Sequence, residues 1–292
     1  MRQPARSDRA HLPAQERPLP QLSRTPEPDA ESRPALTEPV PILDILRAGE
    51  IELVGRLVES SNNALLVRVA HPAAEAHAWL PAEASPLAGL GHGLYAVWKP
   101  TAGERPLFDF PIGTLTHREV AAFEVSEALG WSIVPPTVLR DGPYGEGMLQ
   151  RWIEVDPAAD VVAMITGNDA RLRRVALFDA ILNNTDRKGG HLLPVTGGHV
   201  FVVDHGVTFS VDPKLRTILW AWEDEPFEDE EWAALVTVAA ALRPQAPLDH
   251  RLRELLAARE VVATRRRAEA LLAAGRFPGP NPDWPAIPWP PF

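Results

Sequence analysis

The chain has 292 residues, of which 45% are hydrophobic, and its formal net charge is −10. This length and composition suit a globular protein with a sizeable core, and the excess of acid disfavours a nucleic-acid-binding surface. The sequence contains no cysteine, which excludes disulfides, thiolate metal sites and cysteine nucleophiles.

The first forty residues differ in composition from the rest. Residues 1–40 contain eight prolines and mixed charges but few large apolar side chains, which is typical of a disordered leader. They show no apolar core of a secretory signal, and the apolar stretches elsewhere are too short to span a bilayer. We therefore expect a cytoplasmic protein without a transmembrane segment, and a monomer by default.

The next part of the chain alternates in the manner of strands, with two helices. Its expected elements are a helix over Ile42–Ala48, strands over Ile51–Glu59, Ala64–Val69 and Leu94–Trp98, a helix over Thr116–Leu129, and strands over Val134–Leu139 and Gly147–Ile153. The second helix opens with Thr116 and Glu119 in the spacing of a capping box.

The remaining elements are mainly helical. They are a helix over Asn168–Asn183, a loop, a hairpin of Leu192–Val195 and His199–Val203, and helices over Glu230–Leu242 and Leu248–Ala274. Residues 277–292 are rich in proline and tryptophan, and we expect this tail to pack on the domain. An α+β fold follows, with a β-rich first half and a helical second half.

Lysine is rare in this chain, with only Lys99, Lys188 and Lys214 among 29 basic residues. A compact ammonium at the end of a strand can hold a phosphate. Lys99 follows the third strand, and Glu119 on the next helix is its preferred candidate partner, with Glu124 and Glu127 as the alternatives. The plainer alternatives are a lysine that extends into water and a glutamate that only caps its helix.

Two aspartates follow the long helix. Asp186, in the loop Asn184–His191, can accept a proton from a hydroxyl or orient it, with Lys188 close enough in sequence to neutralise a phosphoryl group. Asp204 ends an apolar strand and is suited to a divalent ion. Taken singly, each aspartate is also explained as a turn residue. In that interpretation Arg187 pairs with a surface acid. The order of Lys99, Glu119, Asp186 and Asp204 along the chain is more specific than any one of these residues.

The segments GLYAVWKP, HREVAAFEVSEALGWSIVPPTVLR, FDAILNNTDRKGGHLLP and FVVDHGVTF resemble the atypical kinases. That group includes the phosphatidylinositol 3- and 4-kinases, the HipA-like bacterial kinases and the secretory-pathway casein kinases. The chain looks most like an actinobacterial family described as phosphatidylinositol 3/4-kinase-like. The resemblance implies a bilobal kinase-like fold, with an N-lobe over 41–153 and a C-lobe over 154–276.

The resemblance also implies roles for individual residues. Lys99 becomes the phosphate-binding lysine with Glu119 as its helix partner, Asp186 the catalytic aspartate, Lys188 its assistant and Asp204 the metal-binding aspartate. The hinge that faces the adenine would be formed by Gln150, Trp152 and Ile153, mostly through backbone groups. The implied cofactors are ATP and Mg²⁺ or Mn²⁺.

Two features depart from the family pattern. His191 stands where the second metal ligand is usually asparagine, and imidazole suits manganese or zinc better than magnesium. The turn between the first strands carries Ser60 and Ser61 in place of a glycine-rich loop, so hydroxyl and amide groups would have to cover the phosphates.

The sequence therefore predicts an ATP-dependent phosphotransferase that phosphorylates a hydroxyl of a small molecule, a lipid headgroup or a protein. Three alternatives stay open at this point. They are an ATP-binding pseudokinase or regulator with little transfer activity, an enzyme that transfers AMP, and an interaction protein that acts through its leader and tail.

Overall fold

The structure is a computed structural model that describes residues 40–57, 63–83 and 85–292. The expected leader lies outside the described residues except for its last position, and Ser60 and Ser61 also lie outside them. From residue 40 onward the described chain belongs to one compact unit.

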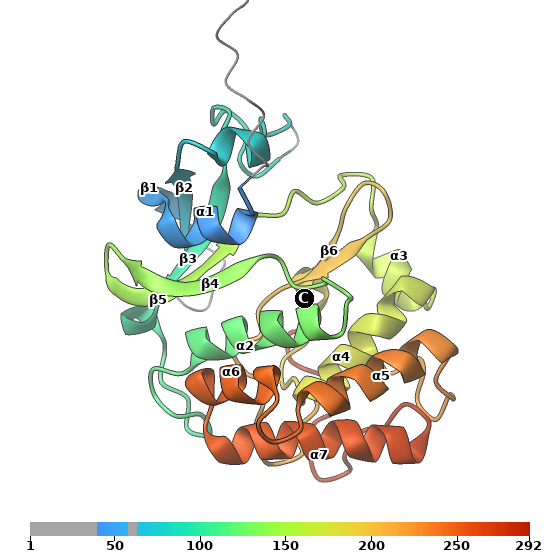
Figure 1. The fold of residues 1–292 in the computed structure, drawn as a ribbon. Helices are drawn as coiled ribbons and strands as arrows, with labels where there is room; N and C mark the ends of the chain where they lie inside the picture. The colour runs from blue at the N-terminus through green and yellow to red at the C-terminus, as the bar shows by residue number, and fades with distance from the viewer. Residues whose placement is uncertain (1–39, 58–62, 84) are drawn as a thin grey trace, which may run out of the picture. The chain divides into compact units, whose positions relative to one another are not determined.

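The β-rich first half forms one antiparallel sheet with the strand order β1-β2-β3-β5-β4 (Figure 1). The strands are β1 (Glu50–Arg56), β2 (Leu65–Ala70), β3 (Tyr95–Pro100), β4 (Thr137–Gly142) and β5 (Gly145–Arg151). Helix α1 (Ile42–Ala48) begins and ends where the sequence predicted, and it buries Ile45 and Leu46 against Trp98 and the other apolar residues on one face of the sheet.

Strand β3 is longer than expected and includes Lys99, which pairs with Met148 of β5. The close approach of the two strands depends on Gly147, because a β-carbon there would meet the Lys99 carbonyl and the ring of Trp98. Lys99 is therefore held in the sheet through its pairing with β5, one residue beyond the last position of β3 that pairs with β2.

Helix α2 (Leu115–Ala128) lies between the sheet and the helical half (Figure 1) and is buried on most of its surface. The predicted capping box was wrong. The helix begins one residue earlier than expected, so Thr116 lies inside it, and the side chain of Glu104 accepts hydrogen bonds from the Thr116 N–H (2.8 Å) and hydroxyl (2.9 Å) instead. Glu119 is thereby free to make other contacts.

The second half is helical apart from a short hairpin. Its elements are α3 (Val161–Thr166), α4 (Arg173–Leu182), β6 (Leu192–Pro194), β7 (Val200–Val202), α5 (Asp229–Ala241), α6 (Pro247–Leu255) and α7 (Ala258–Ala274). The single helix expected over Leu248–Ala274 was wrong, because Leu256 and Ala257 adopt extended backbone angles and separate α6 from α7.

Helix α4 is the centre of this half, since nearly all of its residues are buried in a large apolar cluster shared with α2, α5, α6 and α7. The protein thus has the expected α+β fold, with a β-rich N-lobe and a mainly helical C-lobe.

The proline-rich tail contacts the helical half along its length. The Ala286 carbonyl accepts hydrogen bonds from the Thr217 N–H (3.0 Å) and the Trp220 indole (3.0 Å). The Pro291 carbonyl accepts one from the Gly189 N–H (2.8 Å). The last residues of the chain therefore lie against the loop that follows α4.

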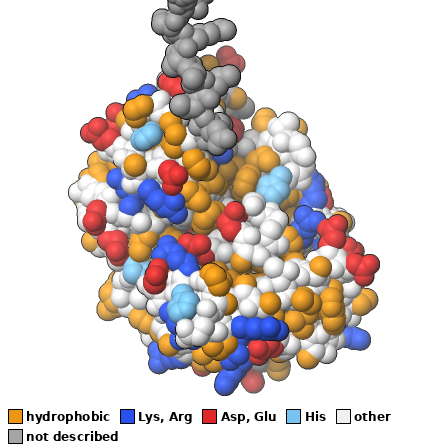
Figure 2. Space-filling view, viewed as in Figure 1, with side chains coloured by type: hydrophobic (Ala, Val, Ile, Leu, Met, Phe, Trp, Pro, Cys, Tyr) orange, Lys and Arg blue, Asp and Glu red, His pale blue; other side chains and the backbone are white. Residues whose placement is uncertain are grey.

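Side chains of both charges are interspersed on the face shown in Figure 2, with apolar groups between them. Among the described helices, none combines the length and the apolar character needed to cross a membrane.

Candidate active site

Three residues from distant parts of the chain meet between the two lobes. The Lys99 ammonium from β3 lies 2.6 Å from Oε1 of Glu119 on α2 and 3.2 Å from Oδ1 of Asp204, which follows β7. The contact expected between Lys99 and Glu119 is therefore present. The side chain of Glu119 is almost fully buried, whereas that of Asp204 is 37% exposed, so the cluster opens to solvent on the side of Asp204.

The charges of the three residues depend on one another. Burial acts to lower the pKa of Lys99, but the carboxylates of Asp204 and Glu119 outweigh it and raise that pKa above its ordinary value. The ammonium of Lys99 in turn holds the pKa of Asp204 well below the usual range. Lys99 is therefore cationic and Asp204 anionic at neutral pH, as a phosphate-binding lysine and a metal-binding carboxylate require.

Glu119 also fixes the backbone beside Asp204. Its Oε2 accepts a hydrogen bond from the His205 N–H at 2.8 Å. Asp204 itself has φ of +63°, in the left-handed region that aspartate tolerates better than most residues. One buried carboxylate thus positions both the lysine and the strained residue that carries the exposed carboxylate.

His191 lies on the other side of Asp204, with Nε2 at 3.3 Å from Oδ2. Its Nδ1 accepts a long hydrogen bond from the Lys188 N–H at 3.4 Å, which places the ring proton on Nε2. Burial lowers the pKa of His191 to about 4. The imidazole is therefore neutral at pH 7, and its protonated Nε2 lies on the side of Asp204.

Asp186 is held between two cations in the loop that follows α4. Its carboxylate lies 3.2 Å from the Lys188 ammonium and 3.4 Å from Nη2 of Arg216. Burial raises the pKa of Asp186, while both cations act to lower it. The Asp186 N–H donates to Oδ1 of Asn184 at 3.0 Å, an Asx turn that fixes the backbone of the loop at Asp186.

The neighbouring Arg187 corrects the expectation of a surface ion pair. Its guanidinium is fully buried and lies 2.9 Å from the equally buried carboxylate of Asp179 on α4. It also donates to the Val203 carbonyl (2.8 Å) and to Nε2 of His205 (2.8 Å). Arg187 therefore links three parts of the site: the helix α4, its own loop with Asp186, and the segment around Asp204.

Of the three residues expected at the hinge, one lies within β5 and two lie in the segment that follows this strand. Gln150 lies within β5, and its side chain donates to the hydroxyl of Thr137 at 2.8 Å. Trp152 follows the strand, and its N–H donates to the Tyr95 carbonyl at 3.0 Å. Ile153 is the next residue of the connection and is half-buried.

Sequence reasoning missed Arg216 and Asp179. Arg216 lies thirty positions after Asp186, and no spacing rule links the two. Its Nε donates to the Thr185 carbonyl at 2.7 Å, which holds it beside the loop. Asp179 carried a usable signal, because a lone carboxylate on the apolar face of a buried helix requires a partner.

Within the described residues, no group of three or more His, Asp or Glu side chains is arranged to hold a metal ion without other ligands. A divalent ion at Asp204 and His191 would need further ligands from a bound phosphate or from water.

Comparisons with known proteins place the chain in a family. No family model matches it. Among solved structures, the proinflammatory kinase CtkA of Helicobacter pylori covers 77% of this chain and 98% of its own, at 11% identity and a TM-score of 0.39, a likeness too distant to indicate a shared function. The Mycobacterium tuberculosis protein Rv2133c is 39% identical over 284 residues, which cover 85% of this chain and 94% of that protein. The chain belongs to the same family as Rv2133c.

Proposed function

We propose that the protein is an ATP-dependent phosphotransferase of the atypical-kinase type, which moves the γ-phosphoryl group of ATP to a hydroxyl. The observation that carries this proposal is the position of Lys99, whose ammonium is held between Glu119 and Asp204 beside a second loop with the aspartate Asp186. Positioning and charge neutralisation account for most of the catalysis of phosphoryl transfer, and these residues supply both.

The residues present fit a nucleotide with a divalent ion. Asp204 offers a partly exposed carboxylate, and Mg²⁺ is commonly bound through one or two carboxylates, phosphate oxygens and water. His191 would add a nitrogen ligand only if Nε2 gave up the proton that now faces Asp204, and such a ligand favours Mn²⁺. The ion would neutralise the charge of the phosphates.

The protein's own groups then divide the work. Lys99 binds a phosphate oxygen, and Glu119 keeps its ammonium in place. Asp186 accepts the proton of the attacking hydroxyl or orients it, and Lys188 offsets the charge of the transferred group. For the adenine, the proposal uses the main chain at Trp152 and Ile153.

Ser60 and Ser61 are proposed to cover the phosphates, a role that their position between β1 and β2 allows. The cytoplasmic location and the monomeric state also stay predictions.

Thermal unfolding with ATP and Mg²⁺ or Mn²⁺ tests the proposal without knowledge of the acceptor. Bound nucleotide stabilises the folded state by mass action, by about 2.7 kcal/mol at a hundredfold excess over Kd. We expect Lys99→Ala to weaken the ATP-induced shift, and Asp204→Asn to lose the part that depends on metal. Asp141→Asn, at an exposed carboxylate, is the matched control. Unchanged shifts in both site variants would refute the assignment.

An ATP-binding regulator with little transfer is the second candidate, and one observation favours it. Nε2 of His191, the protonated ring nitrogen, lies 3.3 Å from Oδ2 of Asp204, at the position where a kinase would present a ligand to the second ion. ATP binding without turnover in any divalent ion would support this candidate. Transfer of AMP is distinguished from transfer of phosphate by the mass of the modified product.

A further inference from the structure

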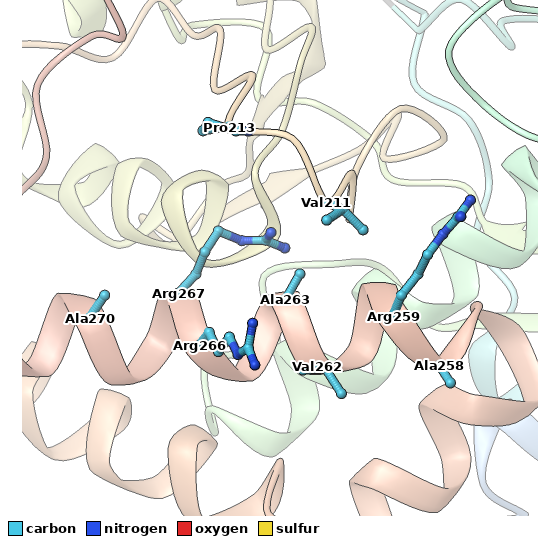
Figure 3. A pocket seen from close by; sticks show the side chains of 9 residues that line it. All are labelled: Val211, Pro213, Ala258, Arg259, Val262, Ala263, Arg266, Arg267 and Ala270. Carbon is cyan, nitrogen blue, oxygen red and sulfur yellow. The ribbon is translucent and has the colours of Figure 1, made fainter.

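A separate pocket lies on the helical half, between α7 and the segment that follows Gly206 (Figure 3). Its volume is about 570 Å³, which is in the range of small-molecule sites. The residues that line it are Val211, Pro213, Ala258, Arg259, Val262, Ala263, Arg266, Arg267 and Ala270.

The lining combines apolar walls with arginine. Alanines on α7 leave room beside the helix, and Val211 and Pro213 close the opposite side (Figure 3). Val211 is 48% exposed in the absence of any occupant. Apolar surface of this kind, combined with a few polar groups, is the usual composition of a site for an organic ligand.

The arginines of the pocket lack acidic partners. Among the described residues, no carboxylate lies within ion-pair distance of Arg259 or Arg266, and both are exposed. Arg267 donates to the neutral carbonyls of Ile181 (3.0 Å) and Ser210 (2.9 Å). The positive charge of the pocket is therefore not neutralised by a neighbouring ion pair.

The acids of α7 are already engaged elsewhere. Glu260 pairs with Arg118 at 2.6 Å, and Glu269 pairs with Arg265 at 3.6 Å. Asp212, between the two wall residues, forms no ion pair with the pocket arginines among the described residues. The chain as a whole is acidic, with a net charge of −10, so this cationic pocket differs from the average of the molecule.

We propose that the pocket binds a small organic anion, in which a phosphate or carboxylate is attached to an apolar body. Arg259 and Arg266 bind the anion, and the alanine, valine and proline surface holds the body. None of the lining residues belongs to the cluster of Lys99, Asp186 and Asp204, so the proposal does not depend on the phosphotransferase function.

Calorimetric titration with 1-naphthyl phosphate tests the pocket. We expect Arg259→Glu/Arg266→Glu to weaken binding by about tenfold or more, the equivalent of about 1.4 kcal/mol. Arg265→Glu is the matched control, because it changes the neighbouring arginine, which pairs with Glu269 outside the pocket. The affinity of Arg265→Glu for 1-naphthyl phosphate should stay within about twofold of that of the wild type. Equal affinities in the two variants would overturn the proposal.

A second variant and four further ligands complete the experiment. Ala263→Phe fills the pocket without changing its charge and should also abolish binding, which separates a loss of contact from misfolding of the charge variant. The neutral 1-naphthol and bare inorganic phosphate should each bind more weakly than the intact probe. Equal binding of 1-naphthol, or displacement of the probe by saturating ATP, would contradict the proposal, as would binding of an acidic peptide but not of the probe.

Discussion

Arg187 and Asp179 form an ion pair in which neither side chain is exposed to solvent. Two charges removed from water are stabilised only if all their hydrogen-bonding groups are satisfied. Arg187 meets this condition through Asp179, the Val203 carbonyl and the His205 ring. The pair therefore holds the loop of Asp186 against α4, since Arg187 is the residue that follows Asp186 in the sequence.

We expect Arg187→Met to lower the free energy of unfolding by about 3–5 kcal/mol, because it leaves Asp179 as an unpaired buried charge. Urea unfolding measures the loss. The control is Arg171→Met, which breaks the largely exposed pair with Asp169 and should cost at most about 1 kcal/mol. Similar losses in the two variants would show that the buried pair has no special weight.

Under the proposed function, we expect His191 to set the metal preference of the site. In His191→Asn an amide oxygen replaces the imidazole, and oxygen ligands suit Mg²⁺. We expect the variant to gain ATP-dependent thermal stabilisation in Mg²⁺ relative to Mn²⁺. His199→Asn, in the hairpin, should leave the ratio unchanged. A ratio that is the same in His191→Asn and wild type would remove His191 from the metal site.

Asp186 is expected to set the acid limit of activity. Burial raises its pKa, and the positive charge of Arg216 acts to lower it. Loss of that charge in Arg216→Met should raise the pKa further, so the rate of ATP turnover should fall at a higher pH on acidification than in wild type. Arg174→Met, on the surface of α4, is the control. Superimposed pH–rate profiles would argue against Asp186 as the base.

Among the larger elements, the tail and the loop after α4 are fitted to each other. Gly189 donates its N–H to the Pro291 carbonyl, and a β-carbon on Gly189 would clash with the ring of Phe292. At Gly190, the next residue, a β-carbon would meet no atom within 4 Å. The tail therefore restricts the loop at one position and leaves its neighbour free.

This difference gives a matched pair of variants. Gly189→Ala should lower the free energy of unfolding by about 1–3 kcal/mol through overpacking, whereas Gly190→Ala should stay within about 0.5 kcal/mol of wild type. Adding Phe292→Ala to Gly189→Ala should remove the clash. The double variant should then lose less free energy of unfolding than the sum of the losses in the two single variants. Additive losses would mean that the ring does not restrict the loop.

The elements also show what the sequence could predict. Local patterns were sufficient for α1, for most strands and for the ordering of Lys99, Asp186 and Asp204 along the chain. The break between α6 and α7 contains no glycine or proline that would have predicted it, because Leu256 and Ala257 are the residues with extended backbone angles there. The capping box failed for a similar reason, because Glu104 from a distant loop caps α2.

At the scale of the whole molecule, buried histidines link stability to pH. His191, with its pKa lowered by burial to about 4 from 6.5, and the fully buried His205 are both neutral in the folded state. The unfolded chain binds protons at these positions first, so their contribution to stability is complete above about pH 6.5 and is lost as the pH falls toward 4.

Between pH 6.5 and 4, we expect the free energy of unfolding to fall less in His191→Gln than in wild type. The difference between the two losses should be about 3 kcal/mol, since one pKa unit corresponds to about 1.36 kcal/mol. Burial raises the pKa values of Asp186 and Glu119, and these groups act in the opposite direction because the folded state protonates them first. The difference between wild type and variant therefore isolates the histidine. His92→Gln, whose ring is half-exposed, should reproduce the wild-type slope, and an equally steep slope in His191→Gln would mean that the ring takes up its proton in the folded protein without cost.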